Sequence, residues 1–349
     1  MTSFFSSIIK NFSNDIGIDL GTANTLVYIR GKGIVITEPS VVAVNKKTDQ
    51  VVAVGRAAKE MLGRTPAHIE AIRPLVDGVI SDFEITHEML SYLLRKANDL
   101  HPKSFPPRVV VGVPSGITNV EHRAVYDATK AAGAREVYIV EEPMAAALGV
   151  GLPVNDAVGS MIIDIGGGTT DIAVLSLGGI VRSKNLRVAG DRLNGDIMNY
   201  IRDEYKLLIG EKTAEDLKIA IGNVMHIEYA EAHVKGRDLL TGLPREILVT
   251  DTDIREAILP SAHLIVNAVK EVLETTPPEI LGDIMQRGVM VAGGGALLRG
   301  FPTLLKQEAG ISVVVADDPL AAVARGAGLV LEHFELYKHL VTQEDYVQI

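Results

Sequence analysis

Two segments of the chain, separated by nearly half its length, repeat one pattern. Residues 16–29 read IGIDLGTANTLVYI and residues 161–174 read MIIDIGGGTTDIAV. When the two are aligned without gaps, Asp19 matches Asp164, and a glycine and a threonine further along also coincide. Each copy runs from an apolar strand through Asp, an apolar residue and Gly to small or hydroxyl-bearing residues and a second strand. The repeat therefore predicts two β-hairpins with glycine-rich turns, one in each half of the chain.

The composition of these turns points to phosphate binding. Glycine permits positive φ and close approach of the backbone, so that successive N–H groups can line a concave anion site. Asp19 and Asp164 cannot bind phosphate themselves, because like charges repel, but each can hold a hydrated Mg²⁺ that bridges phosphate oxygens. An ordinary tight turn capped by Asp would explain either hairpin alone. Two such turns in matching positions favour a nucleotide site.

Apolar β-rich runs alternate with helical patterns along the chain, which predicts an α/β fold. The strand runs are rich in Val and Ile, as expected where both faces of a sheet are covered. A loop-like stretch at 149–160 is the best candidate for a boundary or hinge. The expected strands are 16–20, 25–29, 41–44, 51–54, 108–114, 137–140, 160–165, 171–177, 288–293 and 311–316, and helical patterns lie at 86–99, 119–134 and 195–210.

Composition excludes several other classes of protein. The 349 residues suit two medium domains, and the net charge of −10 without basic runs argues against nucleic-acid binding. The absence of cysteine rules out disulfides, thiolate zinc sites and Cys nucleophiles. The nine histidines show no metal-ligand spacing, which argues against zinc. Neither the P-loop nor the dinucleotide fingerprint fits, since the glycine runs at 31–37, 166–171 and 293–300 all fail the spacing.

The N-terminal segment, MTSFFSSIIKNF, is amphipathic if it is helical. Ser6 and Ser7 interrupt the apolar run that a signal peptide needs. Two interpretations fit the pattern: a terminal helix docked on the body of the protein, or an in-plane membrane helix. At ~100° per residue the apolar side chains fall within an arc of about 140°; they are Phe4, Phe5, Ile8, Ile9 and Phe12.

Five motifs in order resemble the nucleotide-site motifs of the actin, Hsp70 and sugar-kinase superfamily, and in detail those of the MreB family of bacterial actins. The resemblance implies an actin-like ATPase fold: two related α/β lobes around a nucleotide cleft, each lobe with a small inserted subdomain. Lobe I would comprise 1–152 and 330–349 with an insertion at about 36–80, and lobe II would comprise 153–329 with an insertion at about 190–255. The motifs are the two hairpins, EEPMAAALG (141–149), GVMVAGGGALLRG (288–300) and DDPLAAVARGAG (317–328).

The resemblance also implies roles for individual residues. Glu142, directly before a proline, matches the residue that orients the attacking water, and it is favoured over Glu141. A carboxylate suits this role because it accepts the water's hydrogen bond. A helix-dipole role would also explain the two glutamates. Thr169 would contact the γ-phosphate, although it could merely close a turn, and Asp164 would complete the catalytic group with Mg²⁺.

The remaining contacts with ATP or ADP are implied in the same way. The stretch TAEDLK would contact ribose and adenine, while Thr213 and Asp216 at capping-box spacing explain it equally well without a ligand. GGGALL could lie flat against a purine or simply form a strand-to-helix turn. Asp191 and Arg192 could also face the nucleotide. The implied nucleotide-binding residues are Thr22, Ala23, Asn24, Gly166, Gly167, Gly168, Thr169, Glu215, Asp216, Leu217, Lys218, Gly294, Gly295, Ala296, Leu297 and Leu298.

The function that follows is an ATP-dependent cytoskeletal polymer, peripheral on the cytoplasmic face of the membrane, which guides cell-wall synthesis in rod-shaped cells. Implied partners are the protein itself, in head-to-tail protofilaments paired antiparallel, and membrane proteins of the RodZ, MreC and MreD type. A second membrane contact is expected from Phe105 in HPKSFPPR (101–108). The alternatives are a small-molecule kinase or another monomeric ATPase. An Hsp70-like chaperone is nearly eliminated, because little chain follows 326–330 to form a peptide-binding domain.

Overall fold

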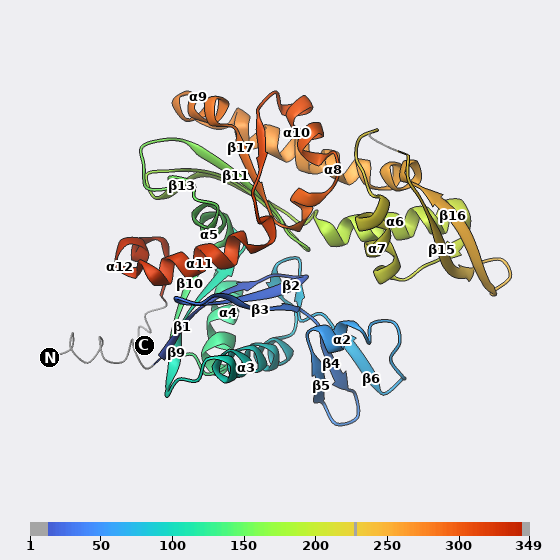
Figure 1. The fold of residues 1–349 in the computed structure, drawn as a ribbon, viewed down its shortest axis with the longest axis horizontal. Coiled ribbons are helices and arrows are strands. Elements are labelled where there is room, and N and C mark those ends of the chain that lie inside the picture. Colours follow the sequence, from blue (N-terminus) through green and yellow to red (C-terminus); the bar gives the residue numbers. More distant parts are fainter. Residues whose placement is uncertain (1–12, 227–228, 344–349) are drawn as a thin grey trace. The chain divides into compact units, whose positions relative to one another are not determined.

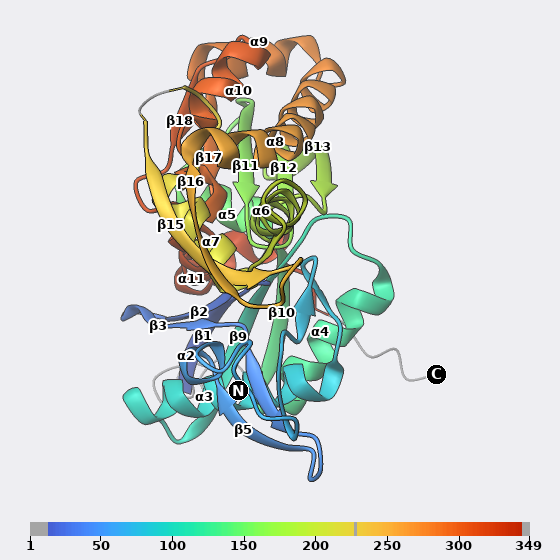
Figure 2. The ribbon, with the colours of Figure 1, turned by 90° about the vertical axis from the view of Figure 1, so that its right-hand side faces the viewer.

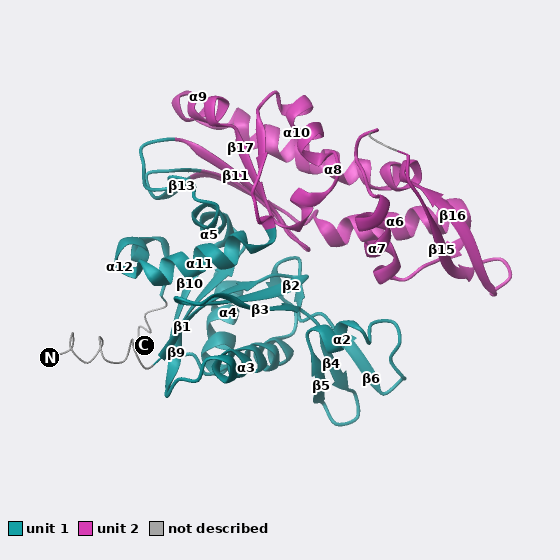
Figure 3. Ribbon diagram, viewed as in Figure 1, with its two compact units in different colours: residues 1–158, 175–180, 320–349 teal, residues 159–174, 181–319 magenta. Residues whose placement is uncertain are grey.

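Two five-stranded sheets organise the chain, and each belongs to one of two units (Figures 1 and 3). The computed structural model describes residues 13–226 and 229–343. Unit 1 consists of residues 1–158, 175–180 and 320–349, and unit 2 of residues 159–174 and 181–319. The chain thus passes from unit 1 to unit 2 between residues 158 and 159, within the stretch 149–160 that the sequence suggests as a boundary. The lobe limits inferred from sequence stay a prediction, and the predicted helix at 1–12 lies outside the described residues.

The sheet of unit 1 has the strand order β10-β9-β1-β2-β3. β1 pairs parallel with β9 and antiparallel with β2, so the first copy of the repeat is the β1–β2 hairpin. Along β1, Ile16 and Ile18 face the core that contains α3, whereas a Cβ on Gly17 would strike Gly328 of α11. The strands are β1 (Ser13–Leu20), β2 (Asn24–Ile29), β3 (Gly33–Pro39), β9 (Phe105–Val113) and β10 (Glu136–Glu141), and the helices around them are α3 (Phe83–Leu100), α4 (Asn119–Ala131), α5 (Glu142–Gly149) and α11 (Ala322–Glu332).

Small residues bring α5 and α11 into close contact. A Cβ on Gly326 would overlap the backbone of Ala145, and a Cβ on Gly149 would overlap the carbonyl of Ala322. The alanine and glycine runs in the third and fifth sequence motifs therefore have a packing role, because only such residues let two helix backbones approach this closely.

This packing predicts an asymmetric response to alanine at two helical glycines. We expect Gly326→Ala to lower the free energy of unfolding by about 1–3 kcal/mol, the usual cost of forcing atoms into a filled interface. Gly282→Ala in α9 (Pro278–Arg287) is the matched control, because a Cβ there meets nothing within 4 Å, and alanine at an unhindered helical position stabilises by about 0.4–1 kcal/mol. Chemical denaturation of both variants measures the difference. Equal midpoints would contradict the close packing.

A small subdomain is inserted after β3. It contains the three-stranded sheet β5-β4-β6 and α2. Lys96 of α3 forms an ion pair with Glu38 of β3 at 2.5 Å, and the N–H of Arg56 in α2 donates to the same carboxylate at 2.8 Å. Burial alone would raise the pKa of Glu38, but these hydrogen bonds lower it. The insertion is thus tied to α3 through one carboxylate. Its elements are β4 (Val42–Asn45), β5 (Gln50–Val54), α2 (Arg56–Lys59) and β6 (Ile69–Ile72), followed by β7 (Leu75–Val76) and β8 (Val79–Ile80).

The sheet of unit 2 has the order β13-β12-β11-β17-β18, in which the second copy of the repeat forms the adjacent strands β11 and β12. β11 and β17 run parallel, and Asp164 lies opposite Ala292. One core joins this sheet to its helices, so the near-continuous Val and Ile runs are buried as expected. The elements are β11 (Ser160–Ile165), β12 (Thr170–Ser176), β13 (Gly179–Leu186), α8 (Asp251–Glu274), α9, β17 (Val289–Ala292), η1 (Gly294–Leu297), α10 (Phe301–Ala309) and β18 (Val313–Val315).

Unit 2 also carries an inserted part, in which a long hairpin lies beside two helices (Figure 2). Its tip is held by Asp238, which accepts hydrogen bonds from the N–H groups of Leu240 and Thr241 and pairs with Arg245 at 2.5 Å. These bonds lower the pKa of Asp238 to about 2, the one from Thr241 most strongly. The elements are α6 (Gly190–Tyr205), β14 (Leu207–Leu208), α7 (Glu211–Ile221), β15 (Glu231–Asp238) and β16 (Pro244–Thr250).

The chain ends with short elements, α12 (Phe334–Tyr337) and η3 (Lys338–Leu340), and η2 (Pro319–Ala321) precedes α11. The helix expected at 195–210 instead begins at Gly190 and ends at Tyr205. It starts earlier because Leu193 and Asn194 are buried and extend its inner face, and it ends where Lys206 adopts a left-handed conformation. Within the described residues, no helix is both long and apolar enough to cross a membrane.

Candidate nucleotide site

The turn of the first hairpin is fixed by groups from distant parts of unit 1. A Cβ on Gly21 would lie 2.6 Å from the carbonyl of Asn24, so glycine is required there. Ser40 Oγ donates to the carbonyl of Gly21 at 2.6 Å, and its N–H donates to Ala23 at 3.0 Å. Thr22 Oγ1 accepts from the N–H of Gly78 at 3.0 Å. The turn at 21–23 is therefore held in a defined shape before any ligand binds.

Asp19 and Glu142 lie at one edge of the unit 1 sheet. Asp19 is opposite Gly112 of β9, Gly112 is opposite Val140 of β10, and Glu142 follows two residues later. All three strands are parallel, so their carboxyl ends, where ligands bind in such sheets, point the same way. Burial raises the pKa of Asp19 from 3.8 to about 7. A nearby cation would stabilise the charged form of this carboxylate, which burial alone disfavours.

Glu142 occupies the first turn of α5. Its neighbour Glu141 is the N-cap and is exposed, whereas Glu142 is only 8% exposed. Pro143 fixes the first turn, and Glu142 packs beside Gly112, where a Cβ would lie at an ordinary contact distance of 3.5 Å from its Cγ but only 2.9 Å from Cγ1 of Val323. The two glutamates thus have different environments, and only Glu142 is held inside the protein.

The turn of the second hairpin is part of a three-element cluster in unit 2. The N–H of Gly166 donates to Thr169 at 2.8 Å and closes the turn. The first residues of α6 bind it, because the N–H of Asp191 donates to Gly167 at 2.8 Å. Lys218 of α7 donates through Nζ to the carbonyl of Gly190 at 2.8 Å. The structure therefore brings the glycine turn, the N-terminus of α6 and a lysine together, a combination suited to anions.

Asp164 is the penultimate residue of β11 and lies against the glycine motif that follows β17. A Cβ on Gly293 would overlap both Asp164 Oδ1 and the carbonyl of Ile165, and one on Gly295 would overlap the side chain of Ile165. Gly293 has φ of +77°, which also favours glycine. Asp164 is 8% exposed. The motif at 293–298 thus sits directly beside the second aspartate. Ala296 is buried and Leu297 is largely exposed.

The helix α7 corrects one interpretation of the sequence. Its N-cap is Gly210, so Thr213 lies inside the helix and does not cap it. Asp216 forms an exposed ion pair with Lys212 at 2.7 Å, and Leu217 packs into the core of unit 2. Lys218, one of the four residues expected to contact the nucleoside, is linked to the glycine turn through Gly190, whose N–H donates to the carbonyl of Gly166 at 3.2 Å.

Arg192 and Asp196 form an i,i+4 ion pair at 3.1 Å on α6. Among residues 13–226 and 229–343, no group of three or more His, Asp or Glu side chains could hold a metal ion.

Ser40 and Gly78, which shape the first turn, were not predicted from the sequence. The sequence around Ser40 does not indicate that its hydroxyl bonds to Gly21, because this contact depends on how the chain folds back after β3.

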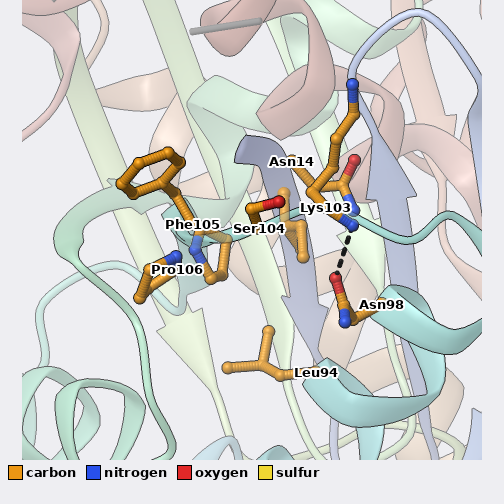
Figure 4. A pocket seen from close by; sticks show the side chains of 9 residues that line it. Asn14, Leu94, Asn98, Lys103, Ser104, Phe105 and Pro106 are labelled. Carbon is orange, nitrogen blue, oxygen red and sulfur yellow. Dashed lines mark hydrogen bonds between the residues drawn. The ribbon is translucent and has the colours of Figure 1, made fainter. Parts of the chain in front are cut away.

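Phe105 begins β9 and is 47% exposed. It lies opposite Ser13 in the β1–β9 register. The first described residue of the chain, Ser13, therefore lies directly beside Phe105. Next to it is a cavity of about 200 Å³, shown in Figure 4, between β1, α3 and the stretch 103–107.

Comparisons with known proteins give a consistent result. A family model described as MreB/Mbl protein matches residues 13–339. The cell shape-determining protein MreB of Escherichia coli is 51% identical over 334 residues, which covers 93% of this chain and 95% of that protein.

Solved structures agree with this match. MreB5 of Spiroplasma citri bound to ADP superposes with a TM-score of 0.89 at 39% identity, covering 94% of this chain and 98% of that one. The same protein bound to AMPPNP gives 0.87. A MamK double helical filament, 24% identical, gives 0.76 over 92% of this chain and 99% of that one. The fold is thus that of the actin-like proteins, as the sequence motifs predicted.

Proposed function

Because this chain belongs to the MreB/Mbl family, we propose that it is a nucleotide-dependent cytoskeletal protein that assembles into membrane-associated filaments and determines cell shape by guiding cell-wall synthesis. The observation that carries this proposal is the pair of hairpin turns, each shaped by glycine and each preceded by an aspartate. Relatives that match nearly the whole chain are cell shape-determining proteins. Because relatives with this function match nearly the whole chain, the alternative of a small-molecule kinase is not favoured.

We assign ATP or ADP to the two glycine turns and to the motif at 293–298. In unit 2, Lys218 and the N-terminus of α6 supply positive potential beside the Gly166 turn. Mg²⁺ usually keeps several waters and binds through one or two carboxylates together with phosphates. Asp19 and Asp164 fit such an ion, since they are partly or largely buried carboxylates at the carboxyl ends of strands β1 and β11. The ion would supply charge neutralisation of the phosphates.

Glu142 is our candidate for the residue that orients the attacking water. Its carboxylate can accept a hydrogen bond from a water molecule. The water oxygen then keeps a lone pair that can attack the γ-phosphorus. Thr169, which closes the second turn through its carbonyl, would contact the γ-phosphate through its hydroxyl or N–H. Slow hydrolysis would then convert ATP filaments into ADP filaments and set their turnover.

The expected partners are further copies of the chain, in head-to-tail protofilaments paired antiparallel, and RodZ-, MreC- and MreD-type proteins. The expected place is the cytoplasmic face of the membrane. A pelleting assay with ATP and Mg²⁺, read by electron microscopy, tests the proposal. Filaments that form with ATP and Mg²⁺ and fail to form without nucleotide would support it, whereas a protein that stays in the supernatant under all conditions would refute it.

Residues 1–12 and Phe105 are the proposed membrane contacts. Deletion of residues 2–12 is expected to abolish co-sedimentation with liposomes and to leave ATP-driven assembly intact. One short helix with a single lysine binds weakly alone, while many helices on a filament bind together with high avidity. The double change Phe4→Ser with Ile8→Ser should act similarly, because it splits the apolar face. If the truncated protein still pelleted with anionic liposomes as well as the full chain, the membrane role would be wrong.

A further inference from the structure

Ser40 binds the first glycine turn through two of its groups. Its hydroxyl donates to the carbonyl of Gly21 at 2.6 Å, and its backbone N–H donates to the carbonyl of Ala23 at 3.0 Å. Ser40 directly follows β3, whose last residue, Pro39, lies opposite Asn24 at the start of β2. One residue thus holds two carbonyls that are two positions apart in the turn.

These two bonds determine where the neighbouring N–H groups point. No peptide bond among the described residues is cis, and in a trans peptide the C=O and the N–H of the next residue point in opposite directions. Because the carbonyl of Gly21 points to Ser40, the N–H of Thr22 is directed away from Ser40. The carbonyl of Ala23 fixes the N–H of Asn24 in the same way. Two N–H donors therefore face the same side of the turn, an arrangement that binds anions.

A second hydroxyl completes this chain of hydrogen bonds. Thr25 Oγ1 lies 2.8 Å from Ser40 Oγ. Ser40 has a single hydroxyl proton, which it donates to the carbonyl of Gly21, so Thr25 must be the donor to Ser40. Thr25 is 1% exposed and Ser40 is 0% exposed. Bulk water therefore does not replace a donor that is lost here, and a buried carbonyl without its donor is costly.

The turn of the second hairpin shows the same arrangement with different donors. The carbonyl of Gly166 accepts from the N–H of Gly190 at 3.2 Å. The carbonyl of Gly167 accepts from the N–H of Asp191 at 2.8 Å. By the same peptide geometry, the N–H groups of residues 167 and 168 point away from the start of α6. In both copies of the repeat, unrelated groups thus hold the carbonyls of the turn and leave its N–H groups on the other side.

We propose that Ser40 is a positioning residue for phosphate binding: it holds the turn at 21–24 so that the N–H groups of Thr22 and Asn24 bind the phosphates of the nucleotide. Ser40 lies on the opposite side of the turn from these N–H groups and acts through the backbone. Donors that already point in the right direction need no reorientation when the phosphate binds. The phosphate as ligand rests on the proposed function, but the orientation of the two N–H groups does not.

Two probes separate this role from a general effect on the fold. Mg²⁺-ATP and adenosine each displace a fluorescent ATP analogue from the full chain, which gives the two affinities. Ser40→Ala should weaken Mg²⁺-ATP by about tenfold, as expected for a buried carbonyl that loses its donor. Adenosine has no phosphate, so its affinity should not change. Unchanged Mg²⁺-ATP affinity would overturn the proposal, and so would an equal loss for adenosine.

Thr25 provides a second test, which also serves if Ser40→Ala does not fold. Thr25→Val keeps the shape of the side chain and removes the donor to Ser40, whereas Thr25→Ser keeps the donor. Thr25→Val should weaken Mg²⁺-ATP by about two- to fivefold, as for the loss of one hydrogen bond, because Ser40 still donates to the turn. Thr25→Ser should bind like the wild type. Equal affinities of the two variants would contradict the proposal.

Thr129→Val is the matched control in the same unit. The hydroxyl of Thr129 is also buried, and it donates to the carbonyl of Val125 at 2.7 Å within α4. Its loss should leave both affinities unchanged. If Thr129→Val weakened Mg²⁺-ATP as much as Ser40→Ala, any buried hydroxyl of unit 1 would have the same effect, and the proposal would be wrong.

Hydrogen exchange of the nucleotide-free chain distinguishes this proposal from the proposed function. The segment 20–26 should exchange faster in Ser40→Ala than in the wild type and in Thr129→Val. If exchange rose in this way but the wild type bound no Mg²⁺-ATP, the orientation by Ser40 would stand and the nucleotide function would be removed. If the wild type bound Mg²⁺-ATP and exchange were unchanged in Ser40→Ala, the role of Ser40 would be refuted and the nucleotide function would remain.

Discussion

Replacing Glu142 by alanine is expected to slow ATP hydrolysis at least about tenfold, the lower range for a group that positions a reacting water. Binding of ATP and Mg²⁺ should persist, because the glycine turns and Asp19 are untouched. Filaments should last longer, since the nucleotide remains a triphosphate. Phosphate release by the purified variant, together with nucleotide affinity, measures both effects.

Glu141 offers the matched control for this experiment. It is the exposed N-cap of α5, next to the buried Glu142. Glu141→Ala should therefore leave the rate of hydrolysis within about twofold of the wild type, since neither the water nor the fold depends on it. If correctly folded Glu142→Ala released phosphate at the wild-type rate, Glu142 would not be the residue that orients the water. If both variants lost the same fraction of the hydrolysis rate, the effect would belong to negative charge at the N-terminus of α5.

Asp19→Asn is expected to have opposite effects on ligand binding and on the stability of the nucleotide-free protein. It removes an anionic partner of the hydrated ion, so the affinity for Mg²⁺-ATP should fall by about tenfold or more, as for loss of a charged contact in a partly buried site. The nucleotide-free protein should become more stable, because burial raises the pKa of Asp19 to about 7 and its charged form is held unfavourably.

The pH dependence gives the sign of this effect. Between pH 3.8 and about 7 the folded state retains a proton on Asp19 that the unfolded state has lost. The free energy of unfolding of the wild type therefore falls as the pH rises through this range. The gain in thermal midpoint from Asp19→Asn should be larger at pH 8 than at pH 5. A gain that did not change with pH, or Mg²⁺-ATP affinity equal to that of the wild type, would contradict this role of Asp19.

The elements that the sequence predicts well are those whose signal is local. The two hairpins follow from contiguous strand–turn–strand patterns, and both glycine turns form where the repeat placed them. The α7 helix shows the opposite case. A threonine followed by an acid three residues later is typical of a capping box, but the helix begins at Glu211 after the N-cap Gly210, so Thr213 lies inside its first turn.

Contacts between distant segments could not be predicted in this way. The hydrogen bonds of Ser40 and Gly78 to the first turn depend on how the chain returns after β3. The bond from Lys218 to Gly190 joins two helices that a strand separates in sequence. The alanine and glycine runs of α5 and α11 were noted as motifs, but their reason, a close contact between helices, requires both to be placed on the sheet.

The position of α11 determines the order in which the protein can complete its two cores during synthesis. This helix packs against α5, β1, β2 and β9 of unit 1, yet it follows the whole of unit 2 in the sequence. Unit 2 is therefore fully synthesised before unit 1 receives α11, and the contacts of α11 with β1 and β2 span most of the chain. Such contacts of high sequence separation form late and slowly. Until α11 is synthesised, the strands that carry Asp19 and lead to Glu142 lack one of the helices that cover them, so a nascent chain has no finished candidate site in unit 1.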